Sequence, residues 1–213
     1  MIKSEQPTVF VVDDDPAICN SLRFLIETVG LDVETYGSAR EFLERYAPNR
    51  PGCLVLDVRM PGMSGLELQT KLRELEIEIP VIILTAFGDV PMAVRAMKNG
   101  AADFAQKPVS DQALLERIQQ AIAKDAARRE EQAEQQMVAA RVDRLTRREH
   151  EVMELVVEGL SSKEIGERLN VSYKTIEAHR AKIMKKMRAE SVPHLVRMCL
   201  MCSKGLSEGR SHG

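Results

Sequence analysis

Short apolar, β-rich runs alternate with stretches of helical spacing over about the first 120 residues. The stretch after the first run, for example, places Leu22, Leu25, Ile26 and Val29 on one side of a helix. The predicted strands are Val9–Val12, Asp32–Tyr36, Leu54–Leu56, Val81–Leu84 and Asp103–Ala105. Strands that alternate with helices in this way predict a parallel sheet with helices on both faces.

Capping boxes, in which a Ser or Thr is followed three residues later by Glu, mark several predicted helix starts. These pairs are Ser38 with Glu41, Ser64 with Glu67, Thr146 with Glu149 and Ser161 with Glu164. The last two pairs lie in a second region, which begins near Leu145. There Ser172 can cap a third helix that runs to about Met187, and a fourth follows from about Val192 to Cys202. This succession of short helices predicts a small all-α domain.

The two regions are joined by one long helical candidate without Gly or Pro, from Ser110 to about Arg141. After Lys124 it contains good helix formers but no apolar stripe, which favours a solvated helical linker. A weak coiled coil is the alternative. We therefore predict a doubly wound α/β domain over 7–123, a linker over 124–142 and a helical domain over 143–206.

Charge separates the two regions, because residues 1–142 carry a net −6 and residues 143–213 a net +4. An acidic first part and a basic second part indicate two different tasks. The chain has neither a long apolar run nor a secretion signal, which predicts a cytoplasmic protein that is not bound to a membrane. Cys199 and Cys202 could form half of a zinc site, but apolar helix positions explain them as well.

Polar residues follow four of the predicted strands, at the edge of the sheet where ligands of such folds bind. Asp13–Asp15 follow the first strand, Asp57 the third, Thr85 the fourth and Lys107 the fifth. Carboxylates gathered there need a cation, and Mg²⁺ suits them because it uses one or two carboxylates and also coordinates phosphate. A carboxylate could then attack a phosphoryl group to give an aspartyl phosphate, with Lys107 and the Thr85 hydroxyl contacting its oxygens.

The segments VVDDD, LVLDVRMPGMSG, VIILTA and FAQKP resemble the receiver domain of two-component response regulators. The resemblance implies strand order 2-1-3-4-5 and phosphorylation of Asp57 by a sensor histidine kinase. It further implies Mg²⁺ bound by Asp13, Asp14, Asp57 and the main-chain carbonyl of Arg59.

The same resemblance implies that Thr85 is a switch hydroxyl, Phe104 a switch aromatic and Lys107 the partner of the phosphate. Phe104 could equally be an ordinary core residue. The family also usually has a cis peptide between Lys107 and Pro108. One departure is Val109, where close relatives often carry Phe.

The predicted helix that Ser172 caps is basic, since residues 172–188 carry a net +5. Its apolar positions Ile176, Ile183 and Met187 should face inward, and small and polar residues flanked by cations suit a helix that enters the DNA major groove. The segment LTRREHEVMELVVEGLSSKEIGERLNVSYKTIEAHRAKIMKKM resembles the LuxR-type helix-turn-helix of FixJ/NarL response regulators. By that resemblance Ser161–Leu169 is the scaffold helix and Ser172–Met187 the recognition helix.

The resemblance assigns two sets of DNA contacts to the recognition helix. Glu177, Ala178 and Ala181 would face base edges. Lys174, Thr175, His179 and Lys182 would mostly position phosphates, and Lys185 lies on the same outward face. His179 could instead be a packed helix residue.

Together the resemblances predict a phosphorylation-controlled transcription factor, with no enzymatic activity beyond phosphotransfer and dephosphorylation on itself. Expected partners are the kinase, promoter DNA, RNA polymerase and, after phosphorylation, a second copy of the chain. The dimer face would include the helix within 88–100, with Val94, Met97 and Lys98 as candidates.

Two other classes of function are alternatives. An aspartyl phosphatase usually carries a second acid two residues after its nucleophile, but Arg59 occupies that position. An RNA-binding or enzymatic output domain is the other alternative, and comparing duplex DNA with RNA binding would distinguish it.

Overall fold

The computed structural model describes residues 6–208, without the side chains of residues 202–208. The chain divides into two compact units, and the boundary along the chain lies between Arg128 and Arg129. Two hydrophobic cores belong to the first unit and one to the second.

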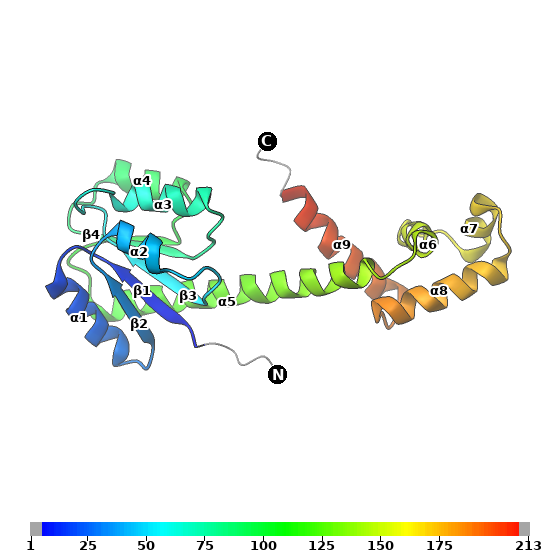
Figure 1. Ribbon diagram of the computed structural model, residues 1–213, viewed down its shortest axis with the longest axis horizontal. Helices are drawn as coiled ribbons and strands as arrows, with labels where there is room; N and C mark the ends of the chain where they lie inside the picture. The colour runs from blue at the N-terminus through cyan, green and yellow to red at the C-terminus, as the bar shows by residue number, and fades with distance from the viewer. Residues whose placement is uncertain (1–5, 209–213) are drawn as a thin grey trace. The chain divides into compact units, whose positions relative to one another are not determined.

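The first unit is built on a parallel sheet of five strands in the order β2-β1-β3-β4-β5, as predicted (Figure 1). The strands are β1 (Thr8–Val12), β2 (Asp32–Tyr36), β3 (Gly52–Leu56), β4 (Val81–Thr85) and β5 (Asp103–Gln106). The helices that follow them are α1 (Pro16–Glu27), α2 (Ala39–Arg45), α3 (Gly65–Glu74), α4 (Val90–Lys98) and α5 (Asp111–Val142). All pairings are parallel, so the carboxyl ends of the strands share one edge.

Alternate side chains of the strands supply two separate cores, one on each face of the sheet. Phe10 and Val12 of β1 pack with residues of α2, α3 and α4. Val9 and Val11 pack with residues of α1 and α5 on the other face. Burial on both faces explains why these strands are continuous apolar runs in the sequence.

The helix α5 differs from the expected solvated linker at two positions. Asp125 is buried, and its carboxylate accepts hydrogen bonds from the main-chain nitrogen of Gly52 at 3.0 Å and from Arg128 at 2.6 Å. Val138 is buried in the core of the second unit. The expectation of a solvent-exposed helix is therefore wrong at Asp125 and Val138, because each packs against its own unit.

The second unit consists, in its described part, of the end of α5 and four further helices (Figure 1). These are α6 (Arg147–Val157), α7 (Ser162–Leu169), α8 (Tyr173–Met187) and α9 (Val192–Glu208). Ile165, Ile176 and Ile183 form the centre of its core. The helices predicted from the capping boxes are thus present, and α9 extends beyond the predicted end at Cys202.

The predicted capping boxes of α3, α6 and α7 form completely, with the Glu side chain bonded back to the capping residue. The pair at α2 forms only in part. Ser38 accepts from the main-chain nitrogen of Glu41, but the Glu41 carboxylate accepts from the nitrogen of Gly37 at 2.8 Å. Local spacing predicted this helix start correctly and the partner of Glu41 incorrectly.

The turn between α7 and α8 depends on two residues. Asn170 ends α7 in the left-handed conformation, with φ 52°. Gly166 lies so close to the next segment that a Cβ there would stand 2.9 Å from the carbonyl oxygen of Val171. The short turn therefore lets α8 pack directly across α7.

An ion pair holds α8 to the start of α6. The ammonium of Lys186 lies 2.6 Å from the buried carboxylate of Glu149. This hydrogen bond, together with one from the main chain of Thr146, lowers the pKa of Glu149 to about 2. The carboxylate thus caps α6 and fixes one end of α8 at the same time.

Candidate functional site

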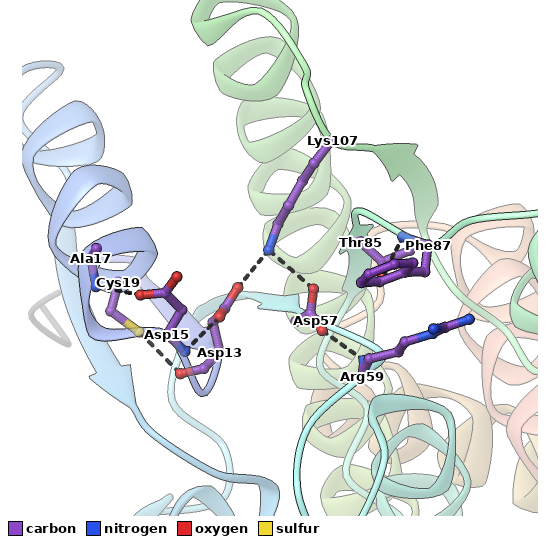
Figure 2. Close-up of polar contacts among 9 residues, drawn as sticks. All are labelled: Asp13, Asp15, Ala17, Cys19, Asp57, Arg59, Thr85, Phe87 and Lys107. Atoms are coloured by element: carbon purple, nitrogen blue, oxygen red, sulfur yellow. Dashed lines mark hydrogen bonds and ion pairs between the residues drawn. The ribbon is translucent and has the colours of Figure 1, made fainter.

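Two of the predicted acidic residues, Asp13 and Asp57, meet around one lysine at the carboxyl edge of the sheet (Figure 2). The ammonium of Lys107, which follows β5, lies 2.6 Å from Oδ2 of Asp13 and 3.0 Å from Oδ1 of Asp57. Both carboxylates are buried. The other oxygen of Asp57 accepts a hydrogen bond from the main-chain nitrogen of Arg59 at 2.6 Å. The structure thus brings together residues that follow β1, β3 and β5.

Burial and pairing set the charges of this cluster. Burial raises the pKa of Asp57 above its usual range, although hydrogen bonds from Lys107 and from the main chain of Arg59 oppose it. Burial alone would lower the pKa of Lys107, but its bonds to Asp13 and Asp57 outweigh burial and raise that pKa. The two carboxylates thus favour the charged form of Lys107, while burial disfavours the ionised form of Asp57.

The three consecutive acids after β1 have three different environments. Asp13 accepts from Lys107 and from the main-chain nitrogen of Asp15 at 2.9 Å. Asp14 is exposed. Asp15 caps α1 through a 2.8 Å bond from the nitrogen of Ala17. Of these three acids, only Asp13 therefore contacts Lys107.

The arrangement fits a small divalent cation. Two buried carboxylates, those of Asp13 and Asp57, already converge on a single positive charge. In the described part of the chain no group of three or more His, Cys, Asp or Glu side chains is placed to hold a metal. Mg²⁺ needs fewer, because it keeps several waters and uses only one or two carboxylates.

Thr85 and Phe104 both lie beside the loop that leads into α4. Thr85 is buried at the end of β4, and its hydroxyl accepts from the main-chain nitrogen of Phe87 at 3.4 Å. Phe104 packs against the core, and a Cβ at Gly88 would lie 2.9 Å from its ring. Movement of this loop would therefore be felt by both side chains. The Lys107–Pro108 peptide is cis, as the resemblance implied.

Two loops also meet through a contact that sequence reasoning missed. The guanidinium of Arg59 lies 4.1 Å from the centre of the Phe87 ring (Figure 2). Only the main-chain atoms of Arg59 were assigned a role from the sequence. No sequence signal marks this contact, because a cation–π pair between loops has no fixed spacing.

The helix α4 presents an apolar stripe to solvent. Val90, Val94 and Met97 lie on one side of the helix at spacings of four and three residues. Val94 is 47% exposed and Met97 is 48% exposed. Exposed apolar residues in a row are typical of a contact surface.

On α8 the predicted inward residues are buried and the predicted DNA-facing residues are accessible. Ile176, Ile183 and Met187 are buried. The exposed members of the predicted surface are Lys174, Thr175, Glu177, Ala178, Ala181, Lys182 and Lys185. His179 is half-buried, and its Nδ1 is buried without a hydrogen-bond partner. The structure therefore places His179 partly inside the helix packing.

The outward lysines of α8 are available to anions. Among the described residues, Lys174, Lys182 and Lys185 form no ion pair with a carboxylate. Arg180 is half-buried beside Val156 and Leu195, as expected for a long side chain whose stem packs. Three unpaired cations on one exposed helix face are suited to contact phosphates.

Cys199 lies partly buried in the core of the second unit, with its sulfur 3.9 Å from that of Met153. This packing agrees with an apolar helix position. The side chain of Cys202 lies outside the described residues. Among the described helices, none is both long and apolar enough to span a membrane.

Comparison with known protein families matches both units. Residues 9–119 match the family described as response regulator receiver domain. Residues 143–199 match the family described as bacterial regulatory proteins, luxR family.

Known relatives match this chain over most of its length and most of their own. Nodulation protein W of Bradyrhizobium diazoefficiens is 46% identical over 92% of this chain and 86% of its own length. The transcriptional regulatory protein FixJ of Rhizobium meliloti is 45% identical over 91% of this chain and 95% of its own.

Solved structures agree with these matches. The response regulator StyR has a TM-score of 0.83 at 44% identity, covering 91% of this chain and 98% of that structure. Full-length FixJ from B. japonicum has a TM-score of 0.56 at 40% identity, covering 93% and 98%. The chain therefore belongs to the transcriptional response regulators of the FixJ type, which join a receiver domain to a LuxR-type DNA-binding domain.

Proposed function

We propose that a sensor histidine kinase phosphorylates Asp57 and that this modification controls DNA binding by α8. The observation that carries the proposal is the Lys107 ammonium, which contacts the carboxylates of both Asp57 and Asp13. Such a cluster fits an incoming phosphate, because its oxygens would replace a carboxylate as partner of the lysine.

In the proposed reaction, a carboxylate oxygen of Asp57 forms a bond to phosphorus, and the bond from phosphorus to the donor's nitrogen or oxygen breaks. Bound Mg²⁺, held by Asp13, Asp14, Asp57 and the Arg59 carbonyl, would neutralise negative charge on the phosphoryl oxygens. Lys107 stays protonated and orients the phosphate. The chain acts only on itself, as phosphoacceptor, and is not an enzyme for other substrates.

The proposed switch runs through the loop after β4. The Thr85 hydroxyl would donate to a phosphate oxygen in place of its present contact with the nitrogen of Phe87. Phe104 lies against Gly88 of the same loop and would follow this movement. The loop leads directly into α4, whose apolar stripe would then pair with the same surface of a second receiver domain.

The proposed DNA contacts lie on α8, in the major groove. Glu177, Ala178 and Ala181 face base edges, whereas Lys174, Thr175, His179, Lys182 and Lys185 contact or approach phosphates. RNA polymerase is the proposed partner at the promoter. A protein with these partners works in the cytoplasm of a bacterium.

Phosphorylation is expected to tighten DNA binding by about a hundred- to ten-thousandfold, because two linked DNA-binding domains occupy neighbouring half-sites. The affinity of the full-length protein for a duplex site, chosen from a random pool, is measured before and after acetyl phosphate with Mg²⁺. Duplex RNA of the same sequence is the comparison ligand. Equal DNA affinity in the two states, or preference for RNA, would contradict the proposal.

Replacing Lys182 by Ala is expected to weaken binding to all DNA sequences and to reduce the salt slope of log affinity by about one unit. The reason is that Lys182 is exposed and forms no ion pair with any described carboxylate, so its charge is available to a phosphate. Lys124, exposed on α5 and outside the DNA-binding domain, provides the matched control as Lys124→Ala. A salt slope that Lys182→Ala leaves unchanged would place the phosphate contacts elsewhere.

A further inference from the structure

One acidic side chain stands in the middle of the basic, exposed face of α8. Glu177 is the only acid between Tyr173 and Met187, a helix with five lysines and arginines. It lies one turn after Lys174, yet the two form no ion pair. An acid at the centre of a surface that contacts phosphates weakens the electrostatic attraction to DNA. Its presence there is explained if it makes a specific contact of its own.

The carboxylate of Glu177 is held by a residue of the neighbouring helix. The hydroxyl of Ser162 donates a hydrogen bond to Oε1 of Glu177. Ser162 is buried and is the first residue of α7, whose start is fixed by the capping box of Ser161 with Glu164. The bond therefore joins the scaffold helix to the recognition helix and restricts the rotamers of an otherwise exposed side chain.

The second oxygen, Oε2, makes no hydrogen bond to any described residue, and Glu177 itself is exposed. An ionised carboxylate can only accept hydrogen bonds. In the major groove the available donors are the amino groups of cytosine (N4) and adenine (N6). Adenine presents the acceptor N7 beside its amino group, which would repel a carboxylate, so cytosine is the better partner.

The neighbours of Glu177 allow this close approach. Ala178 and Ala181 are exposed and small, so the helix can lie close to the base edges. We propose that Glu177, oriented by Ser162, selects cytosine at one base pair of each half-site. Glu177 is the specificity-determining residue and Ser162 is its positioning residue. This inference rests on the proposed placement of α8 in the major groove.

The test selects binding sites from random duplex DNA with the full-length protein at low salt, followed by sequencing. Wild-type protein is expected to prefer cytosine at one position by about 5- to 100-fold, the range for one good base contact. Glu177→Ala should abolish the preference at that position alone. Glu177→Gln should change it toward adenine, because a glutamine amide both donates and accepts.

Ser162→Ala separates positioning from a merely structural role. The variant leaves no buried polar group unpaired, since Glu177 is exposed, so the domain is expected to fold with a nearly unchanged melting temperature. It should nevertheless broaden the preference at the same position as Glu177→Ala. Glu167→Ala removes an exposed acid of α7 and should leave the selected sequence unchanged.

Salt-dependent, non-specific binding of the protein to DNA distinguishes failure of this inference from failure of the proposed function. If no variant, including wild type, binds DNA in a salt-dependent way, the proposed function itself is wrong. If all variants bind DNA but select the same sequence, or if the wild-type site shows no dependence on cytosine, Glu177 does not read a base. A Ser162→Ala variant that folds and keeps full selectivity would overturn the positioning role.

Discussion

Replacing Asp57 by Ala is expected to reduce phosphoryl incorporation from acetyl phosphate and Mg²⁺ to background. Asp57 lies beside Lys107 and also accepts from the main chain of Arg59, so its oxygens are held where a positive side chain can receive the phosphate. The measurement is intact-mass spectrometry, followed by mapping of the modified peptide in the wild-type protein.

The Asp57→Ala variant should remain folded, because Lys107 keeps its 2.6 Å contact with Asp13 and loses only one of two partners. A circular dichroism melt checks this point. Asp15→Asn is the matched control, since Asp15 caps α1 and does not contact Lys107. It should be labelled like wild type, whereas removal of Mg²⁺ by chelation should prevent labelling of both. Full labelling of folded Asp57→Ala would place the phosphoacceptor elsewhere.

The sequence predicted the sheet and the cluster around Lys107 because both depend on repeating local signals. Buried strands are continuous apolar runs, and parallel strands bring their carboxyl ends to one edge. Asp13, Asp57 and Lys107 each follow a strand directly, so strand order alone was enough to bring them together. The individual tasks of Asp13, Asp14 and Asp15 could not be separated, because they depend on the local direction of the chain after β1.

Contacts between distant polar residues were not predictable from spacing. The sequence predicts Asp125 to be a surface residue of a charged helix. Its carboxylate instead accepts a hydrogen bond from the main-chain nitrogen of Gly52, which is 73 residues away. The bond from Ser162 to Glu177 likewise crosses between two helices. Such pairs follow no period, in contrast to capping boxes, where the partners stand three residues apart. The first contact shows that the start of α5 belongs to the first unit, and the second shows how one acid of α8 is oriented.

The division of α5 bears on how two activation mechanisms can be compared. In one, phosphorylation pairs two receiver domains; in the other, the receiver blocks α8 until it is phosphorylated. Val138 is buried in the second core, and Arg141 donates to the carbonyl oxygen of Met187 at 3.2 Å. A fragment that begins after Val138 would therefore lack part of the core of the DNA-binding domain. A fragment over 129–213 follows the compact unit and is the suitable one to measure.

Under the pairing mechanism, fragment 129–213 binds DNA weakly, well below the phosphorylated full-length protein, because a single small domain makes few phosphate contacts. Under a mechanism in which the receiver only masks α8, the fragment binds as tightly as the phosphorylated protein. Both affinities are measured on one selected duplex at the same salt concentration.

Replacing Val94 by Arg is expected to abolish most of the gain in DNA affinity that phosphorylation produces. Because that gain comes from linking two DNA-binding domains, the affinity of the phosphorylated protein should fall by about a hundredfold. Val94 lies in the apolar stripe of α4 and is 47% exposed, so a single domain should tolerate the change. In a symmetric pair the new cation faces its own copy and adds to Arg95 and Lys98 on the same helix, so the two surfaces repel.

Phe24→Arg, on α1 at the opposite face of the sheet, is the control for an added surface charge and should keep the gain. Sedimentation of both phosphorylated variants scores dimers, and the extent of phosphorylation is measured in the same samples. A phosphorylated Val94→Arg protein that is monomeric and still binds tightly would show that pairing of receivers does not drive activation.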